Sequence, residues 1–208
     1  RRNEVLGLRW SNVDLRNKRF AVVEQLPFKV PPGTTEITEM APTKSQDRIL
    51  PITDVTLPFF VRQQQLQQKQ RELAELSGQP YYDNHLVVAK ADGSPARADR
   101  VTNNFGQFLR HQNMPHIRFH DLRHSAATNM HELTGDFYTV GEILGHTLKG
   151  IGLSLGISTN MADVTARYVD VRLDRKRTVL EAYHNAMFPR EVERIAAKRM
   201  ADRTHDER

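Results

Sequence analysis

The chain has 208 residues, no cysteine, 38% hydrophobic residues and a formal net charge of +5. This length is typical of one domain, and the lack of cysteine excludes a disulfide scaffold and a thiolate zinc site. The sequence shows neither an apolar run long enough to span a bilayer nor a signal-peptide pattern, and a reducing, intracellular compartment fits it. The basic charge fits a polyanionic partner such as nucleic acid, although many basic proteins bind none.

The first quarter of the chain predicts a helix and two strands. Residues 1–10 read as an amphipathic helix already under way, so we expect a fragment of a longer protein. Valine and phenylalanine predict a strand over residues 19–26, and alternation of apolar and polar residues predicts another over residues 48–53. Between them, residues 27–42 carry four prolines and predict a long loop. Lys44 follows this loop in a turn.

The remaining chain is expected to be mainly helical. A long helix is predicted from Thr53 or Asp54 to Gly78, with the glutamine run at residues 63–68 on its solvated face. A short strand is predicted at residues 85–89, and residues 148–160 read as a flexible glycine-rich loop. Further helices are predicted at residues 97–112, 120–133, 136–146, 162–171, 173–188 and 189–203. These elements predict an α+β, mainly α fold, in which a helical domain carries a small antiparallel β-sheet.

His120 and Arg123 are the first candidates for chemistry. At a spacing of three they share one helix face, and two such donors suit an anion, above all a phosphate. The alternative is a solvated basic face. If the helix extended back to His116, then His116, His120 and His124 would line one side and could hold zinc, but residues 117–119 read as extended.

His146 and Tyr168 are the next candidates. His146 follows the end of a predicted helix, where it could donate a hydrogen bond to an anion or cap the helix. Tyr168 could act as a nucleophile in cationic surroundings, or it could be a half-buried aromatic residue. Arg1, Lys44 and Arg123 are cations in separate motifs that could together neutralise a phosphate in its transition state, without a metal.

The order of these motifs resembles the tyrosine recombinase (phage integrase) family. The chain has R-x-x-E at residues 1–4 followed by LGLRW, and then a lysine in a turn between two strands. HDLRHSAAT begins at residue 120, LGH ends at His146, and T-x-x-Y ends at Tyr168. The resemblance extends from residue 1 to about residue 172, and HDLRHSAAT and LGH are its most specific parts.

The resemblance implies roles for the residues that match the family's motifs. Arg1 matches the first catalytic arginine, with Glu4 in a supporting structural role. Lys44 matches the hairpin lysine that acts as general acid toward the leaving 5′ oxygen, and Lys29 is a weaker rival because no R-I-L-P-I strand follows it. His120 would take the tyrosine proton or position the phosphate, and Arg123 would clamp the non-bridging oxygens.

For the last two residues, the resemblance implies that His146 hydrogen-bonds the scissile phosphate and that Tyr168 is the nucleophile. The implied reaction resembles that of type IB topoisomerases and passes through a covalent 3′-phosphotyrosyl intermediate, with no cofactor. Tyr168 follows His146 by 22 residues (168 − 146), more than is usual in the family, so residues 148–160 look like an insertion. Tyr138 and Tyr183 fit the nucleophile's place less well, and action in cis or in trans stays open.

The resemblance also implies organisation and partners. We expect residues 1–188 to form the catalytic domain, truncated at its N-terminal edge, and residues 189–208 to form a C-terminal helical tail. The expected partner is double-stranded DNA at a specific recombination site, bound by a homotetramer in the cytoplasm or on the bacterial nucleoid. A mobile-element integrase is the first functional prediction. The alternatives are DNA relaxation like that of a type IB topoisomerase, or a catalytically inactive DNA-binding protein.

Overall fold

Helices surround a small antiparallel sheet, as predicted. The computed structural model describes residues 1–44, 47–145 and 172–206, with side chains up to residue 198. The helices are α1 (Arg2–Leu6), η1 (Trp10–Asn12), α2 (Leu57–Leu76), α3 (Ala98–His111), α4 (Asp121–Thr134), α5 (Phe137–Leu144), α8 (Leu173–Met187) and α9 (Pro189–Asp206). The strands are β1 (Val13–Asp14), β2 (Arg19–Val22), β3 (Glu24–Gln25), β4 (Ala41–Pro42) and β5 (Arg48–Pro51).

One long hairpin supplies most of the strands. β1, β2 and β5 form a three-stranded antiparallel sheet in that order, with Phe20 opposite Leu50 and Val22 opposite Arg48. The same two chain segments pair again further out, as β3 and β4. The predicted strand at residues 19–26 is therefore split into β2 and β3, and the proline-rich loop connects β3 to β4. Lys44 lies between β4 and β5, in the turn predicted for it.

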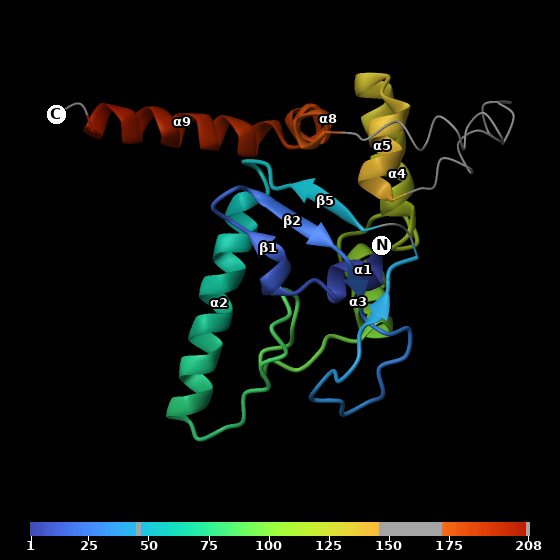
Figure 1. Cartoon of the computed structure of the whole chain (residues 1–208), viewed down its shortest axis with the longest axis vertical. Helices are drawn as coiled ribbons and strands as arrows, with labels where there is room; N and C mark the ends of the chain where they lie inside the picture. Colours follow the sequence, from blue (N-terminus) through green and yellow to red (C-terminus); the bar gives the residue numbers. More distant parts are fainter. Residues whose placement is uncertain (45–46, 146–171, 207–208) are drawn as a thin grey trace, which may run out of the picture.

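The main core lies between the sheet and three helices. Helices α4, α5 and α8 pack against one another, α5 and α8 also pack against β5, and Figure 1 shows α8 and α9 at one end of the molecule. Apolar side chains from all these layers form one buried cluster, made of Val22, Leu50, Met130, Val140, Ile143, Leu144 and Val179. Because α5 contributes three of these residues, its position is fixed by burial of apolar surface.

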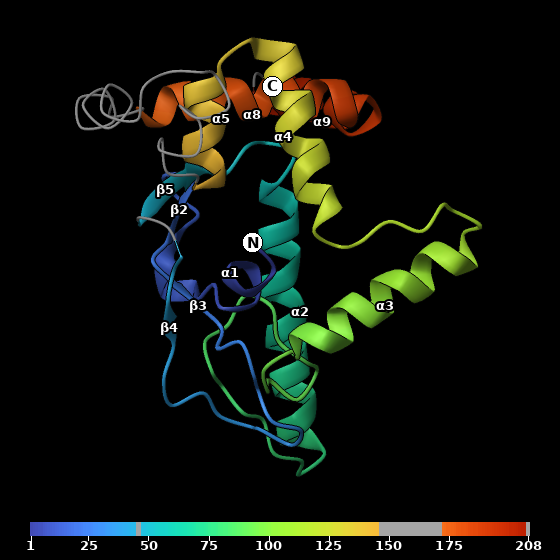
Figure 2. The ribbon, with the colours of Figure 1, turned by 90° about the vertical axis from the view of Figure 1, so that its right-hand side faces the viewer.

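A smaller cluster holds α1 and α3 beside the hairpin. Leu6, Leu26 and Ala98 are its buried members. α1 ends at Leu6, earlier than the predicted helix over residues 1–10, and Gly7 explains why. A Cβ on Gly7 would lie 2.7 Å from the carbonyl carbon of Gln25, so only glycine lets α1 approach β3 this closely. Figure 2 shows α3 apart from α4, α5 and α8, joined to α4 by an extended segment.

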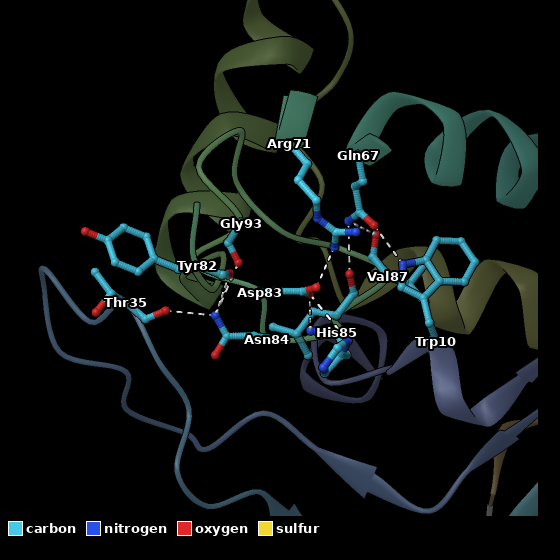
Figure 3. A network of polar contacts seen from close by, with 11 residues as sticks. Trp10, Thr35, Gln67, Arg71, Tyr82, Asp83, Asn84, His85, Val87 and Gly93 are labelled. Atoms are coloured by element: carbon cyan, nitrogen blue, oxygen red, sulfur yellow. Dashed lines mark hydrogen bonds and ion pairs between the residues drawn. The ribbon is translucent and has the colours of Figure 1, made fainter. Parts of the chain in front are cut away.

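The prediction of a strand at residues 85–89 is wrong. That segment makes only isolated bridges, between Arg9 and Leu86 and between Ala89 and Pro95. Gln67 on α2 donates to the carbonyl of Leu86 at 2.9 Å and to the next carbonyl at 3.1 Å, so a side chain takes the place of a neighbouring strand. Its amide oxygen accepts from Trp10 Nε1 at 2.7 Å (Figure 3). Gln67 is therefore buried and is the exception to the predicted solvated glutamine face, because the other glutamines of the run are exposed or partly exposed.

The same network fixes the segment that joins α2 to α3. Asn84 donates to the carbonyl of Thr35 at 2.8 Å and to that of Gly93 at 3.3 Å, which ties the segment to the β3–β4 loop (Figure 3). Arg71 on α2 forms an ion pair with Asp83. Side-chain hydrogen bonds thus replace regular structure in this part of the fold.

Other predicted boundaries hold with small shifts. α2 begins at Leu57 with Thr56 as N-cap, later than the predicted start at Thr53 or Asp54. The predicted break at Pro189 separates α8 from α9. The predictions for residues 148–160 and 162–171 lie outside the described residues. In the part of the chain that the structure describes, no helix is both long enough and apolar enough to cross a membrane.

Candidate active site

Two of the predicted arginines meet at the C-terminal end of α5. Arg1 Nη2 donates to the carbonyl of Gly145 at 3.2 Å, and Arg123 Nη2 donates to the carbonyl of Leu144. Carbonyls in the last turn of a helix have no amide partner within that helix, and the helix dipole makes them attractive to cations. Residues more than 120 positions apart in the sequence therefore place their guanidinium groups side by side.

A third arginine joins them from β5: Arg48, the first residue of the R-I-L-P-I segment, for which the sequence predicted no role of its own. Arg48 Nε donates to the carbonyl of Ile143 at 3.1 Å, and its Nη2 lies 2.7 Å from Glu4 Oε2. Arg48 is only 8% exposed. The sequence held one signal for it: in RILP, Arg48 alternates with Leu50 and so shares the face of β5 that points into the core.

Glu4 is the anion that holds this group together. It is 3% exposed, and its Oε1 accepts from Arg1 Nη1 at 2.9 Å while Oε2 accepts from Arg48. Burial alone would raise the pKa of Glu4, but the hydrogen bonds from Arg48 and from the amino group of Arg1, together with the charges of these two groups, lower it to about 2. The predicted supporting role of Glu4 thus has a physical basis, because its charge is fixed against two guanidinium groups.

The cluster carries more positive than negative charge. Three guanidinium groups face one carboxylate, and the pKa of Arg123 falls to about 10, first through burial and then through repulsion from Arg1. Arg123 is still charged at neutral pH, and an added anion would relieve the repulsion. The arrangement is therefore suited to bind an anion such as a phosphate, and the prediction of a merely solvated basic face is wrong for Arg123.

The side chains beside the arginines line an open cavity of about 520 Å³. Arg1 and Lys44 lie on its wall together with His120, so three of the predicted site residues border the same space. Lys44 and His120 are both exposed, unlike the arginines. Lys44 therefore borders the same cavity as Arg1, and its role as general acid stays a prediction.

His120 is the N-cap of α4, and Arg123 lies in the first turn of that helix. Partial loss of water around the ring lowers the pKa of His120 first, and the positive charges of His124 and Arg123 lower it further. Its ring is therefore neutral at pH 7 and able to accept a proton. Because α4 begins at Asp121, His116 does not share a helix face with His124, and no group of metal ligands was found among the described residues.

Two predicted site residues, His146 and Tyr168, lie outside the described residues. The described chain reaches the site at Gly145, whose carbonyl Arg1 binds, and continues at Arg172 before α8. The structure thus brings together Arg1, Lys44, His120 and Arg123. The roles assigned to His146 and Tyr168 stay predictions.

Comparison with known proteins identifies the family of this chain. The sequence model of the Phage integrase family matches residues 1–151. A protein described as "Tyrosine recombinase XerC-like", from Caldanaerobacter subterraneus subsp. tengcongensis, is 26% identical over 170 residues. The match covers 77% of this chain but only 42% of that relative's length. The crystal structure of XerA recombinase aligns with 91% of this chain and 53% of its own, at a TM-score of 0.47 and 16% identity. The match of the family model over most of the sequence shows that this chain belongs to the phage integrase, or tyrosine recombinase, family.

Proposed function

We propose that this chain is the catalytic part of a site-specific DNA recombinase. The observation that carries the proposal is the pair of guanidinium groups, from Arg1 and Arg123, held at the end of α5, of which Arg1 also lines an open cavity. Two fixed guanidinium groups suit the non-bridging oxygens of one phosphodiester, because guanidinium is a permanently charged donor that forms strong hydrogen bonds to phosphate oxygens. Family membership points to the same substrate class.

The proposed reaction is a phosphoryl transfer to a tyrosine. The phenolic oxygen of Tyr168 attacks a DNA phosphodiester, an O–P bond to tyrosine forms, and the bond from phosphorus to the 5′ oxygen breaks. Lys44 gives a proton to that 5′ oxygen, while the tyrosine proton goes to His120 or to water. Arg1, Arg123 and His146 stabilise the charge on the phosphate oxygens. Arg1, Arg123 and Lys44 would supply the positive charge that balances the negative charge on the phosphate.

The second half of the reaction reverses the first. A 5′ hydroxyl from another DNA strand attacks the 3′-phosphotyrosyl bond and releases Tyr168. The energy of the broken linkage is kept in that bond, so no nucleotide cofactor is consumed. Integration by a mobile element is the biological use that we infer, with a homotetramer on the DNA and residues 189–208 as a C-terminal helical tail to the catalytic domain at 1–188.

The two alternatives keep the same site but differ in outcome. A topoisomerase-like enzyme would relax supercoiled DNA without a defined site or several protomers. A DNA-binding protein that has lost catalysis would bind DNA and form no adduct, and the long separation of Tyr168 from His146 is the feature that favours it.

The test is a suicide-substrate assay on the full-length protein. Labelled, nicked duplexes that tile the DNA on both sides of the gene are incubated with protein and EDTA, and then run on a denaturing gel. We expect a protein-linked DNA band that disappears in Tyr168→Phe and persists in Tyr138→Phe, a matched change at a partly exposed tyrosine on α5. If the folded protein binds a duplex but gives no band, the catalytic proposal is wrong.

A further inference from the structure

Arg48 is a buried cation to which the proposed reaction gives no role. Its side chain joins three elements: it belongs to β5, donates to the last turn of α5 at Ile143, and pairs with Glu4 on α1. The two bonds leave from different nitrogens, Nε and Nη2, at 3.1 and 2.7 Å. One planar group therefore sets the distance between the end of α5 and α1.

Arg1 and Arg123 together form the proposed anion clamp, and both elements that Arg48 joins hold it in place. Arg1 directly precedes α1, and the end of α5 binds both guanidinium groups. Glu4 passes the constraint to Arg1 through a 2.9 Å contact, and Arg1 in turn reaches the carbonyl of Gly145. Arg123 binds the carbonyl of Leu144, the residue between the two that Arg48 and Arg1 bind. Three successive carbonyls thus receive three arginines, and a shift of the last turn of α5 would move all of them.

We propose that Arg48 is a positioning residue, which locks the last turn of α5 against α1 so that Arg1 and Arg123 address one phosphate. This inference rests on the proposed function, because it assigns the clamp to a phosphodiester. Arg48 itself lies behind the clamp, with its guanidinium group used by Glu4 and by Ile143.

A purely structural role explains Arg48 poorly. Burying a third guanidinium beside two others costs free energy, and an apolar side chain of similar size often stabilises a protein better than a buried ion pair does. Lysine could not replace it, since one ammonium group cannot span both acceptors with a planar fork. The gain from Arg48 is orientation, and a displacement of about 1 Å in a phosphate clamp is enough to cost about 100-fold in rate.

The test compares Arg48→Met with a matched control, Lys176→Met, in the full-length protein. Lys176, on α8, is also a buried cation and is 6% exposed. Its ammonium group lies 3.6 Å from the carboxylate of Glu142 on α5, the helix that Arg48 also contacts. It contacts a side chain of α5, whereas Arg48 binds the backbone of its last turn. Both changes remove a buried charge and keep an unbranched apolar chain, so both are expected to lower thermal stability.

The kinetic readouts separate positioning from stability. On the tiled duplex that binds most tightly, we expect Arg48→Met to slow adduct formation about 30- to 100-fold. The dissociation constant should change less than about threefold, because Arg48 is only 8% exposed and so offers little surface to a ligand. Lys176→Met should leave the rate within about twofold of the parent. A rate loss shared equally by both variants would overturn the proposal.

The pH profile of adduct formation is a second readout. Glu4 is faced by Arg1 at the start of its own helix, by Arg48 from β5 and by Arg123 from α4. Without Arg48, the pKa of Glu4 rises, so Glu4 is neutralised at a higher pH and releases Arg1. We expect the acid limb of the profile to move to higher pH in Arg48→Met and to stay in place in Lys176→Met.

Crystal structures of the two variants decide the inference even if the protein cleaves no duplex. We expect the guanidinium groups of Arg1 and Arg123 to move apart in Arg48→Met and to keep their places in Lys176→Met. Unmoved guanidinium groups in a folded Arg48→Met would overturn the proposal. If the parent is active but the clamp is unmoved in Arg48→Met, only the role of Arg48 is rejected. If the parent is inactive but the clamp is displaced in Arg48→Met, only the recombinase function is rejected.

Discussion

The two sides of the proposed site are built differently. On one side, Arg1, Arg48 and Arg123 each bind a backbone carbonyl at the end of α5 and surround a buried carboxylate. On the other side, Lys44 and His120 stand exposed on the cavity. The arginine side is fixed by the packing of the fold, before any ligand arrives. The lysine and histidine side is left open to the ligand that completes it.

The difference matches two kinds of chemistry. Stabilising a charge that develops in a transition state requires donors that are already in place, because moving them during the reaction costs free energy. Transferring a proton requires a group that can reach the reacting oxygen and change its protonation state. We therefore expect changes on the arginine side to affect both stability and rate, and changes on the open side to affect rate alone.

The largest effect is expected from Arg123→Met. The change removes one clamp on the phosphate and leaves the carbonyl of Leu144 without this donor. Removal of one such donor typically costs about 100- to 1,000-fold in rate. Single-turnover adduct formation on a nicked duplex measures it, and Arg62→Met, at an exposed position of α2, is the control. Equal rates for Arg123→Met and the control would contradict the role of Arg123.

Glu4→Gln should cost about 3 kcal/mol of stability at pH 7, because it leaves Arg48 buried without a countercharge. The pKa of Glu4 is about 2 in the folded protein, against an ordinary value of 4.5. The unfolded state therefore binds the proton first on acidification, and folding is favoured by the charge above pH 4.5. This advantage is lost as the pH falls toward 2.

Urea unfolding of the parent and of Glu4→Gln between pH 2 and 7 measures this linkage. The two unfolding free energies should converge as the pH falls through the window from 4.5 to 2. A difference that stays constant over the whole range would mean that the charge of Glu4 does not matter to the fold.

Lys44→Ala tests the open side. Because Lys44 is exposed, we expect a change in the free energy of unfolding below about 0.5 kcal/mol. The rate of adduct formation should fall about 100-fold through loss of the general acid. A duplex with sulfur at the 5′ bridging position should restore it, since a thiol has a pKa of about 8.5 and leaves without protonation. If sulfur fails to restore the rate, Lys44 is not the acid.

The smallest effect is expected at a buried polar pair away from the site. His184 Nδ1 lies 2.8 Å from Thr53 Oγ1, and burial lowers the pKa of His184. Thr53→Val should cost about 1 kcal/mol of stability and leave adduct formation unchanged. Since the folded histidine resists protonation, the parent loses stability as the pH falls below 6.5, which thermal unfolding from pH 5 to 8 would show. A change in the rate of adduct formation would mean that the pair of Thr53 and His184 is coupled to the proposed site.

Local patterns in the sequence were sufficient to predict α2, α3, α4, α5, α8 and α9 and to suggest the proposed chemistry. The motif H-x-x-R appears at the start of α4 because a helix places residues three apart on one face. A proline stop separates α8 from α9, as the missing amide donor of proline requires. The boundary of α1 and the strand at residues 85–89 were predicted wrongly, because a tight contact at Gly7 and the side chain of Gln67 decide them from a distance.

The sequence by itself determined the family and the residue types of the site, since both depend on the order of short motifs along the chain. Only the tertiary structure decided how those residues are held. The end of α5 collects arginines from positions 1, 48 and 123 because burial of the apolar residues of α5 fixes that helix against β5 and α4. Arg48 begins the R-I-L-P-I segment, but its proposed role depends on the acceptors that folding brings to it.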